Sequence, residues 1–237
     1  MQLSAPIYVL KRKARLLARQ NGIALHEALD KIALDHGFQS WGHLASFSAA
    51  DSPTTGILSR LVSGDLALIG ARPGQGKTLL GLELAAKASQ IGRKGYFFTL
   101  AYHRRDVENR FSTLGIDRRS DADPVVIDTS DDVSADYIIT RLSAEKRATF
   151  IVVDYLQLLD QRRTNPCLDA QMTSLQRYVE GAGAICSVIS QIDRSFDLSG
   201  KSMPDLSDVR QPNPLDLSRF RKFFFLHNGT IRFDQAA

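Results

Sequence analysis

The feature that most constrains this chain is an apolar run that breaks into a glycine-rich turn ending in Gly-Lys-Thr, within residues 66–80. The run Leu-Ala-Leu-Ile-Gly predicts a buried strand, and residues 77–90 have the pattern of an amphipathic helix. In such a strand–turn–helix unit, successive backbone N–H groups form a nest for an anion, and the helix adds the positive end of its dipole. The turn therefore predicts a phosphate-binding P-loop.

The P-loop predicts which residues contact ATP. They are Ala71, Arg72, Pro73, Gly74, Gln75, Gly76, Lys77, Thr78 and Leu79. Lys77 is expected against the outer phosphates as a catalytic cation, and the Thr78 hydroxyl is expected to hold Mg²⁺. The pattern G-x-x-x-x-G-K-[ST] has one departure, because its first glycine falls at Ala71. A chance glycine-rich turn is the alternative, which the flanking strand and helix disfavour.

Composition bounds the class of protein. The chain has 237 residues, 43% of them hydrophobic and 24% charged, which suits one good core with a small appendage. No apolar run approaches the ~20 residues of a membrane span, and the N-terminus lacks a signal-peptide layout. We therefore expect a cytoplasmic protein with no membrane partner. Cys167 and Cys186 are too few and too isolated for a disulfide framework or a metal site.

Residues 1–48 predict a small all-α module with helices at 6–20, at 25–36 and after Ser40. This module carries six Lys and Arg against three Asp and Glu, and so most of the net charge of +4. A basic segment of this kind binds nucleic acid or an acidic partner, or is simply a solvated helix face. The sequence leaves these alternatives open. Residues 49–56 are small and polar and predict a linker.

From residue 57 to 237 the pattern alternates between strands and helices, which is typical of a parallel sheet covered by helices. Strands are expected at 65–70, 95–100, 124–128, 149–154 and 184–190. Helices are expected at 77–90, 103–113, 133–146 and 168–180. Residues 222–233 predict two strands around an Asn228-Gly229 turn. The expected fold class is α/β with a mainly parallel sheet.

Two of the expected strands end in polar side chains. Asp154 follows Ile-Val-Val, and Gln191 follows Ser-Val-Ile-Ser. Ligand sites in parallel sheets lie at the carboxyl ends of the strands, so Asp154 is expected beside Thr78 as a support for Mg²⁺. The alternative is that Asp154 caps a turn. Gln191 would sense the outermost phosphate or its attacking water, and Arg194 follows on the exit loop.

Four segments together resemble the ATPase domain of the DnaB-type replicative helicases. They are Gly-Asp-Leu…Ala-Arg-Pro…Gly-Lys-Thr at 64–78, Ile-Val-Val-Asp-Tyr-Leu-Gln-Leu-Leu at 151–159, Ser-Gln-Ile-Asp-Arg-Ser at 190–195 and Leu-Ser-Asp-Val-Arg at 206–210. They follow the family's order and nearly its spacing, over about residues 56–233. That family also has Ala at the first P-loop glycine. Its own N-terminal domain has no counterpart here, where residues 1–48 take its place.

The resemblance implies a RecA-like fold that binds ATP and Mg²⁺. It also implies a homo-oligomer such as a hexameric ring, replication-type protein partners and single-stranded DNA. By position in the motifs, Lys77 and Gln191 take catalytic roles, and Thr78 and Asp154 hold the metal. Arg194 and Arg210 are the expected nucleic-acid contacts.

Two departures from the family concern hydrolysis. The family's second strand ends in a Glu that positions the attacking water, and here Ala101 stands at that place. The family's K-x-R-N-G run sends two cations to the neighbouring subunit, and here residues 225–229 read Phe-Leu-His-Asn-Gly. General bases contribute ~10²–10⁴-fold and arginine fingers ~10³–10⁵-fold. We therefore expect ATP binding with weak hydrolysis, and the alternative is a non-hydrolysing nucleotide-dependent regulator or adaptor.

An active motor remains a further hypothesis if other residues replace the missing groups. The candidate replacements are the acids Asp106, Glu108, Asp131 and Asp132 and the cations His103, Arg104 and Arg105. A small-molecule P-loop kinase is a weaker hypothesis, because the sequence offers no segment for an acceptor pocket or a lid.

Overall fold

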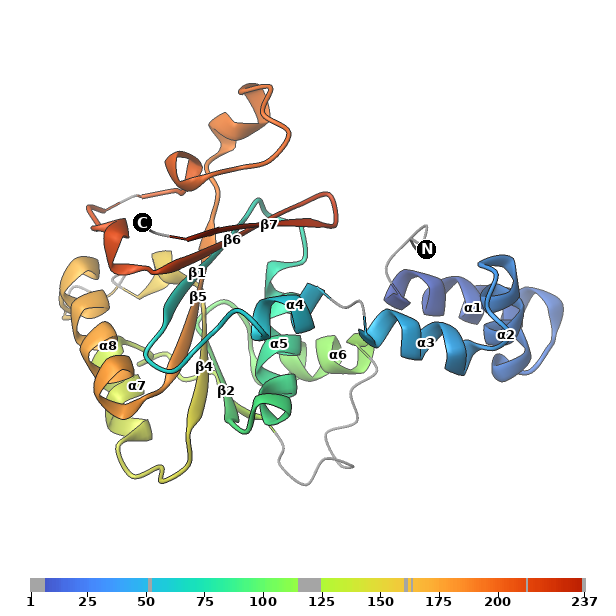
Figure 1. The fold of residues 1–237 in the computed structure, drawn as a ribbon, viewed down its shortest axis with the longest axis horizontal. Coiled ribbons are helices and arrows are strands. Elements are labelled where there is room, and N and C mark those ends of the chain that lie inside the picture. The colour runs from blue at the N-terminus through green and yellow to red at the C-terminus, as the bar shows by residue number, and fades with distance from the viewer. Residues whose placement is uncertain are drawn as a thin grey trace. The chain divides into compact units, whose positions relative to one another are not determined.

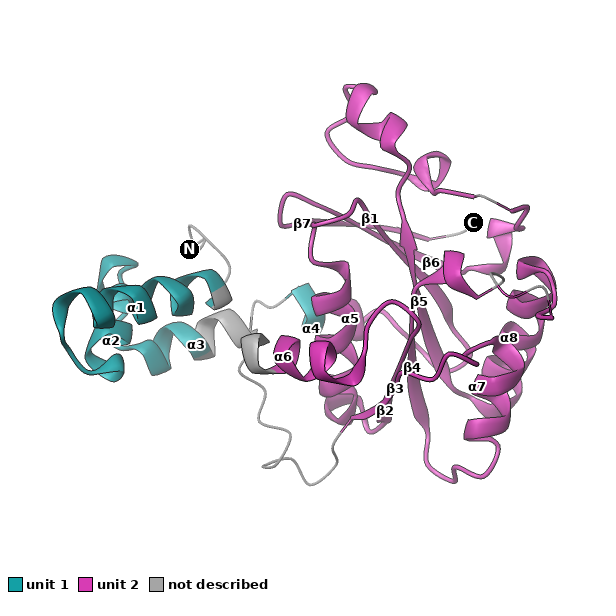
Figure 2. Ribbon diagram, turned by 180° about the vertical axis from the view of Figure 1, so that it is seen from behind, with its two compact units in different colours: residues 1–56 teal, residues 57–237 magenta. Residues whose placement is uncertain are grey.

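The computed structural model describes residues 7–50, 53–114, 125–159, 162, 164–211 and 213–235. The chain forms two compact units, which we name the helical unit (residues 1–56) and the sheet unit (residues 57–237) (Figure 2). Among the described helices, none is long and apolar enough to cross a membrane. Residues 6 and 124, predicted to begin the first helix and the third strand, lie outside the described residues.

The helical unit contains the three predicted helices. They are α1 (Ile7–Asn21), α2 (Leu25–Asp35) and α3 (Trp41–Ala50). The start of α3 is fixed by two side chains, since Ser40 Oγ accepts the His43 N–H at 3.2 Å and the Asp30 carboxylate accepts the Trp41 N–H at 2.8 Å. Trp41 packs against the small core of this unit. That core consists of Leu10, Ala33, Phe38 and Leu44.

The stretch predicted as a linker, residues 49–56, is partly helical in the residues that the structure describes. The helix α3 continues to Ala50, and α4 (Pro53–Leu58) begins three residues later. Proline fits the first helical position because its missing N–H would have no partner inside the helix. The small polar composition therefore marks a junction of two helices, and the division between the units falls inside α4.

Seven strands form one sheet in the sheet unit (Figure 1). They are β1 (Leu66–Ala71), β2 (Lys94–Thr99), β3 (Val126–Asp128), β4 (Thr149–Asp154), β5 (Ile185–Gln191), β6 (Lys222–His227) and β7 (Thr230–Gln235). Their order is β3-β2-β4-β5-β1-β6-β7, and every neighbouring pair is parallel except the β6–β7 hairpin around Asn228-Gly229. The predicted α/β class with a mainly parallel sheet is confirmed.

Helices cover both faces of the sheet (Figure 1). One face carries α5 (Lys77–Ala86), the short 3₁₀ helix η1 (Lys87–Ile91) and α6 (Arg104–Leu114), and the other carries α7 (Ala135–Leu142) and α8 (Leu168–Ala182). The loops contain the 3₁₀ helices η2 (Leu156–Leu158), η3 (Arg194–Leu198), η4 (Leu206–Asp208) and η5 (Leu217–Arg219). The helix predicted at 133–146 is shorter in the structure, since Ser134 caps its start and Glu145, beyond its end, pairs with Lys94 and Tyr96 on β2.

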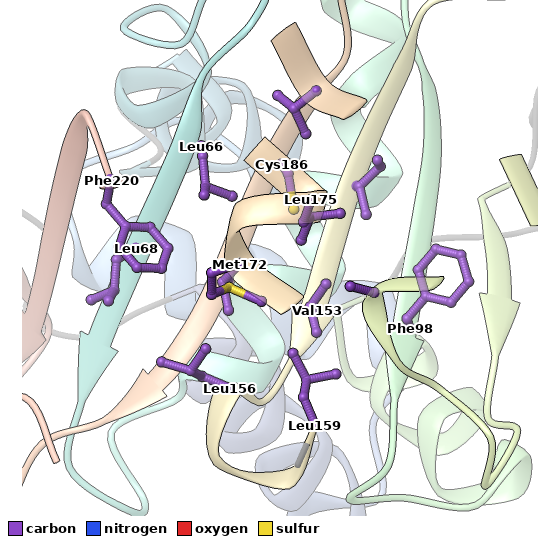
Figure 3. Packing of buried hydrophobic residues seen from close by; sticks show 14 of the residues in the cluster. Leu66, Leu68, Phe98, Val153, Leu156, Leu159, Met172, Leu175, Cys186 and Phe220 are labelled. Carbon is purple, nitrogen blue, oxygen red and sulfur yellow. The ribbon is translucent and has the colours of Figure 1, made fainter. Parts of the chain in front are cut away.

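Packing on both faces fixes where the P-loop lies. In Figure 3, Met172 and Leu175 of α8 lie among the buried side chains of the central strands. On the opposite face, a Cβ at Gly95 of β2 would lie 1.8 Å from the carbonyl oxygen of Ala85. Only glycine therefore allows the end of α5 to approach β2 so closely. This close approach holds α5, and with it the P-loop at its start, against the middle of the sheet.

Candidate nucleotide site

The P-loop between β1 and α5 has the backbone that an anion nest requires. Gly74 and Gly76 have φ values of 81° and 88°, and a Cβ at either would meet no atom within 4 Å. Positive φ is thus the reason for glycine at both positions. Ala71 is the last residue of β1 and lies outside the set with positive φ, so that position needs no glycine.

The amino end of α5 is open to an anion. Gly76 precedes the helix, and no side chain caps this end. The first N–H groups of a helix lack partners inside the helix and attract negative charge. Lys77 and Thr78, the first two residues of α5, therefore present backbone donors together with a cation and a hydroxyl group.

Asp154 is the most unusual side chain at this edge of the sheet. It ends β4, it is 1% exposed, and neither carboxylate oxygen has a hydrogen-bond partner among the described residues. Burial raises the pKa of Asp154 to about 6, although the nearby Thr78 hydroxyl and the charges of Lys77 and Arg110 act in the opposite direction. Buried polar groups are normally paired, so this carboxylate fits a cation that binds from outside the chain.

Lys77 shares this charged region with Asp154. Burial lowers the pKa of Lys77, the charge of Asp154 raises it, and the charge of Arg72 lowers it again. Carboxylate and hydroxyl oxygens are ligands that Mg²⁺ accepts, with water and phosphate oxygens completing the shell. Thr78 and Asp154 therefore fit Mg²⁺, and Lys77 with the P-loop amides fits phosphate.

Ala101 lies two residues beyond Thr99, the register partner of Asp154 on β2. Thr99 pairs with Asp154 in register, the Leu100 N–H donates to the Asp154 carbonyl at 3.2 Å, and the Ala101 N–H donates to Thr99 Oγ1 at 3.1 Å. Residue 101 thus places a methyl group where a carboxylate was expected from the family. The four acids considered as replacements are all exposed, and Asp132 pairs with Arg162.

Arg110 is a cation near the site that sequence reasoning missed. Its guanidinium carbon lies 4.1 Å from the centroid of the Tyr102 ring, its charge acts on Asp154, and its Nε is buried without a hydrogen-bond partner among the described residues. It follows Val107 by three positions and precedes Phe111, and both of these are buried. That spacing is the signal that would have placed Arg110 on the sheet-facing side of α6.

The sequence suggested three other residues as replacement cations. His103, Arg104 and Arg105 are exposed, and Arg104 donates to the Ile127 carbonyl at 3.2 Å. Arg110 is therefore the cation of α6 whose charge reaches the buried carboxylate.

Gln191 lies opposite Ala71 in register, at the end of β5. Its side-chain oxygen accepts a hydrogen bond from Arg210 at 3.2 Å. Gln157, a second residue that sequence reasoning missed, donates to Ser190 Oγ at 2.8 Å and to the Arg210 carbonyl at 2.7 Å, and accepts the Gln191 N–H at 3.3 Å. This network joins the proposed phosphate sensor to one proposed nucleic-acid contact.

The segment 193–209 projects from the sheet unit (Figure 1, orange), and it is hydrogen-bonded to the P-loop. Ile192 and Val209 form an antiparallel bridge at its base. Arg72 donates to the Asp197 carboxylate at 2.8 Å and to the Ile192 carbonyl at 3.0 Å. Arg194 is exposed on this segment. The P-loop residue Arg72 thus binds the segment that carries Arg194.

The β6–β7 turn also lies against the P-loop. The Asn228 N–H donates to Gln75 Oε1 at 2.8 Å, and the His227 ring packs edge-on against Phe196 at 5.1 Å between centroids. Neither Phe225 nor His227 supplies the permanent cations that the DnaB-type family has at these positions.

No known family profile matches the chain. One solved structure, an ATPase domain, is similar over 78% of this chain and 81% of its own, with a TM-score of 0.61 and 19% identity. A DnaB-like replicative helicase, described with its interactions with primase, is similar over 92% of this chain and 67% of its own, with a TM-score of 0.58 and 18% identity. A KaiC-like protein from Pyrococcus horikoshii is similar over 68% and 70%, with a TM-score of 0.52 and 19% identity.

The chain has a RecA-like fold. Identities below one in five support the fold and nothing finer, so the resemblance to DnaB-type helicases is confirmed at the level of the fold. The RecA-like sheet unit carries the P-loop, Asp154 and Gln191 at one edge, because β1, β4 and β5 are neighbours and run in the same direction.

Proposed function

We propose that the RecA-like sheet unit binds ATP with Mg²⁺, hydrolyses it slowly and acts on or near DNA in the cytoplasm. The buried carboxylate of Asp154, which lacks a hydrogen-bond partner among the described residues and lies near Lys77 and Thr78, is the observation that carries this proposal. A Mg²⁺–phosphate group supplies the cation that Asp154 lacks and the anion that the P-loop nest and the start of α5 attract.

Each residue takes a distinct part in this binding. The P-loop from Ala71 to Leu79 surrounds the phosphates with its backbone N–H groups, which every residue but Pro73 has, and Lys77 neutralises their charge. Thr78 and Asp154 hold Mg²⁺, which when bound withdraws charge from the phosphate oxygens. Gln191 monitors the outermost phosphate from the neighbouring strand.

Slow hydrolysis follows from the chemistry of Ala101 and Arg110. A methyl group at residue 101 neither orients water nor accepts its proton. Arg110 supplies positive charge from within the same chain, and positive charge stabilises the negative charge that develops on the phosphate in the transition state. Because a guanidinium has no acceptor atom, it does not replace a carboxylate base.

Action on DNA is supported by the arrangement of two exposed arginines. Arg194 lies on the segment that Arg72 ties to the P-loop, and Arg210 donates to Gln191. A conformational change at the phosphates would therefore reach the Arg194 segment through Arg72, and Arg210 through Gln191. By analogy with the DnaB-like fold, we propose single-stranded DNA as the ligand of these residues, and self-assembly or a replication-type protein as the further partner.

A non-hydrolysing nucleotide-dependent regulator is the second candidate, favoured by the missing carboxylate at residue 101. Both candidates predict ATP binding, and turnover separates them.

The deciding experiment measures Mg²⁺–ATP binding and turnover on one preparation, with and without single-stranded DNA. We expect binding with low turnover, and loss of binding in Lys77→Ala. Lys87→Ala is the matched control, because Lys87 is a half-buried lysine that pairs with Glu83 further along the same segment. Absence of ATP binding in the unaltered protein would refute the site. Fast, DNA-stimulated turnover would refute slow hydrolysis and leave the site intact.

A further inference from the structure

The helix α1 of the helical unit carries an uninterrupted basic surface. It spans 15 residues and contains no acidic residue. Lys11, Arg15 and Arg19 follow one another at intervals of four, and Arg12 lies beside them on the helix. At about 3.6 residues per turn, these four side chains occupy an arc of about 100°. We call them the α1 basic face.

The α1 basic face is separate from the part of α1 that folds the unit. Leu10 and Ala14 are fully buried, and they lie on the neighbouring side of the helix. Arg12, Arg15 and Arg19 are exposed, and Lys11 is half-buried. The core of the unit therefore needs the apolar side of α1 and leaves the basic side to solvent.

No carboxylate neutralises the α1 basic face within the described parts of the chain. No ion pair involves Lys11, Arg12, Arg15 or Arg19 there. The acids that the structure describes in this unit lie on α2, and one of them, Asp30, accepts the backbone N–H of Trp41. In the sheet unit, by contrast, arginines such as Arg72, Arg219 and Arg221 are paired with acids.

We infer that the α1 basic face binds the phosphate backbone of nucleic acid. From Lys11 to Arg19 the row is ~12 Å long at ~1.5 Å per residue, and a DNA duplex presents about seven phosphate charges over that length. Contacts of this kind need regularly spaced cations and no apolar anchor. The inference concerns the helical unit and does not rest on the nucleotide site.

Two other polyanions fit the α1 basic face less well. An anionic membrane surface binds basic helices that also insert an apolar side, and the apolar side of α1 is already buried in the unit. An acidic protein partner would normally bury an aromatic or aliphatic cluster at the centre of the contact. Leu16, 50% exposed, is the large apolar side chain that α1 presents in the described residues.

The test uses the full chain without nucleotide and measures its binding to a short labelled DNA duplex of random sequence and to a single strand of equal length, as salt rises from about 50 to 200 mM. We expect the triple variant Arg12→Gln, Arg15→Gln, Arg19→Gln to bind at least tenfold more weakly. Its slope of log K against log salt should fall by about two to three. The single strand and the duplex report which form is preferred.

Matched controls test whether DNA binding depends on where the positive charges lie or only on how many there are. Lys146→Gln, Arg177→Gln, Arg221→Gln removes the same charge from the sheet unit and should leave the slope nearly unchanged. Arg→Lys at residues 12, 15 and 19 keeps the charge and should retain binding. Circular dichroism and ATP binding check that each of these variants is folded.

Three results would overturn the inference. One is equal DNA binding by the unaltered protein and the residue 12, 15 and 19 glutamine variant. Another is equal weakening by the control triple variant. The third is binding to vesicles of phosphatidylcholine and phosphatidylserine in a protein that does not bind DNA.

Discussion

Two buried aspartates, one at the amino ends of the strands and one at their carboxyl ends, have contrasting surroundings. Asp65, just before β1, is 2% exposed, and its carboxylate pairs with Lys222 at 2.6 Å and accepts the Val62 N–H at 2.8 Å. Asp154, at the end of β4, is 1% exposed and has no hydrogen-bond partner among the described residues. At equal burial, Asp65 therefore has a direct ion pair, whereas Asp154 has only the charges of Lys77 and Arg110 and the Thr78 hydroxyl in its surroundings.

The contrast extends beyond these two residues. At the amino ends of the strands, Lys94 pairs with Glu145, and Arg93 donates to the carbonyls of Thr149 and Gly183. At the carboxyl ends, Arg110 Nε also lacks a hydrogen-bond partner among the described residues. The buried charges at the amino end are thus paired within the fold, whereas Asp154 and Arg110 Nε at the carboxyl end lack hydrogen-bond partners among the described residues, as our proposal of a ligand site there requires. The predictions below test this difference, from the largest expected effect to the smallest.

Asp65→Asn is expected to lower the free energy of unfolding by about 3–5 kcal/mol, because it leaves the Lys222 ammonium buried without its counter-charge. Urea unfolding of the ligand-free protein measures the change. The double variant Asp65→Asn, Lys222→Met removes the unpaired charge and should recover part of the loss. A loss below about 1 kcal/mol in the single variant would mean that the Asp65 pair does not stabilise the fold.

Ala101→Glu is expected to raise ATP turnover about 10²-fold, since it adds a carboxylate just beyond β2, at the same edge of the sheet as Asp154, while the trans-acting cations stay absent. Ala101→Gln has nearly the same size but accepts no proton, so its turnover should stay low. Steady-state phosphate release compares the variants. An equal rise in both would show that side-chain volume, and not base chemistry, limits hydrolysis.

Asp154→Asn is expected to raise the stability of the ligand-free protein by about 1–2 kcal/mol at neutral pH. The pKa of Asp154 in the folded protein is about 6, above its ordinary value of 3.8, so the folded state loses stability as pH rises from 3.8 through 6. The variant cannot ionise and should show no such loss. Thermal unfolding across this range gives the comparison.

The same Asp154→Asn variant should lose the tightening of ATP binding by Mg²⁺. Higher ligand-free stability together with weaker Mg²⁺-dependent binding is the result expected of a residue kept for a ligand. Lower stability at neutral pH would place Asp154 with Asp65 as a structural residue.

Glu145→Gln is expected to cost less than about 1 kcal/mol at neutral pH, because the carboxylate is partly exposed. Hydrogen bonds from Tyr96 and Lys94 lower the pKa of Glu145 from 4.5 to about 2. Its contribution is therefore complete above pH 4.5 and disappears as pH falls through about 2. Unfolding of both proteins over this range should give curves that converge in acid. A constant difference would assign the effect to packing.

The strands, the helices and the P-loop were predictable because each is encoded by local pattern. Apolar runs marked the strands within a residue or two, and Gly-Lys-Thr marked the start of α5. Patterns of this kind depend on neighbours within a few residues. The polar stretch at 49–56 was predicted as a linker, and α4 begins within it because Pro53 suits the first position of a helix.

The candidate site was predictable only in part. Lys77, Thr78 and Asp154 were expected together because strands of this class carry ligands at their carboxyl ends. Arg110 and Gln157 were missed, since a polar residue on a helix or in a loop is more often a solvated one than a member of a site. Their relevance comes from what they act on, which is Asp154 in one case and the end of β5 in the other.

By itself the sequence determined the α/β class, the glycine-rich turn between a strand and a helix, and the absence of a carboxylate at residue 101, because these are properties of residue types at short spacing. The tertiary structure alone decided that Asp65 is paired while Asp154 has no hydrogen-bond partner among the described residues, and that Arg72 binds Asp197, 125 positions away. The reason is physical: pairing of a buried charge depends on which strands become neighbours, and strand order is set by packing of the whole sheet.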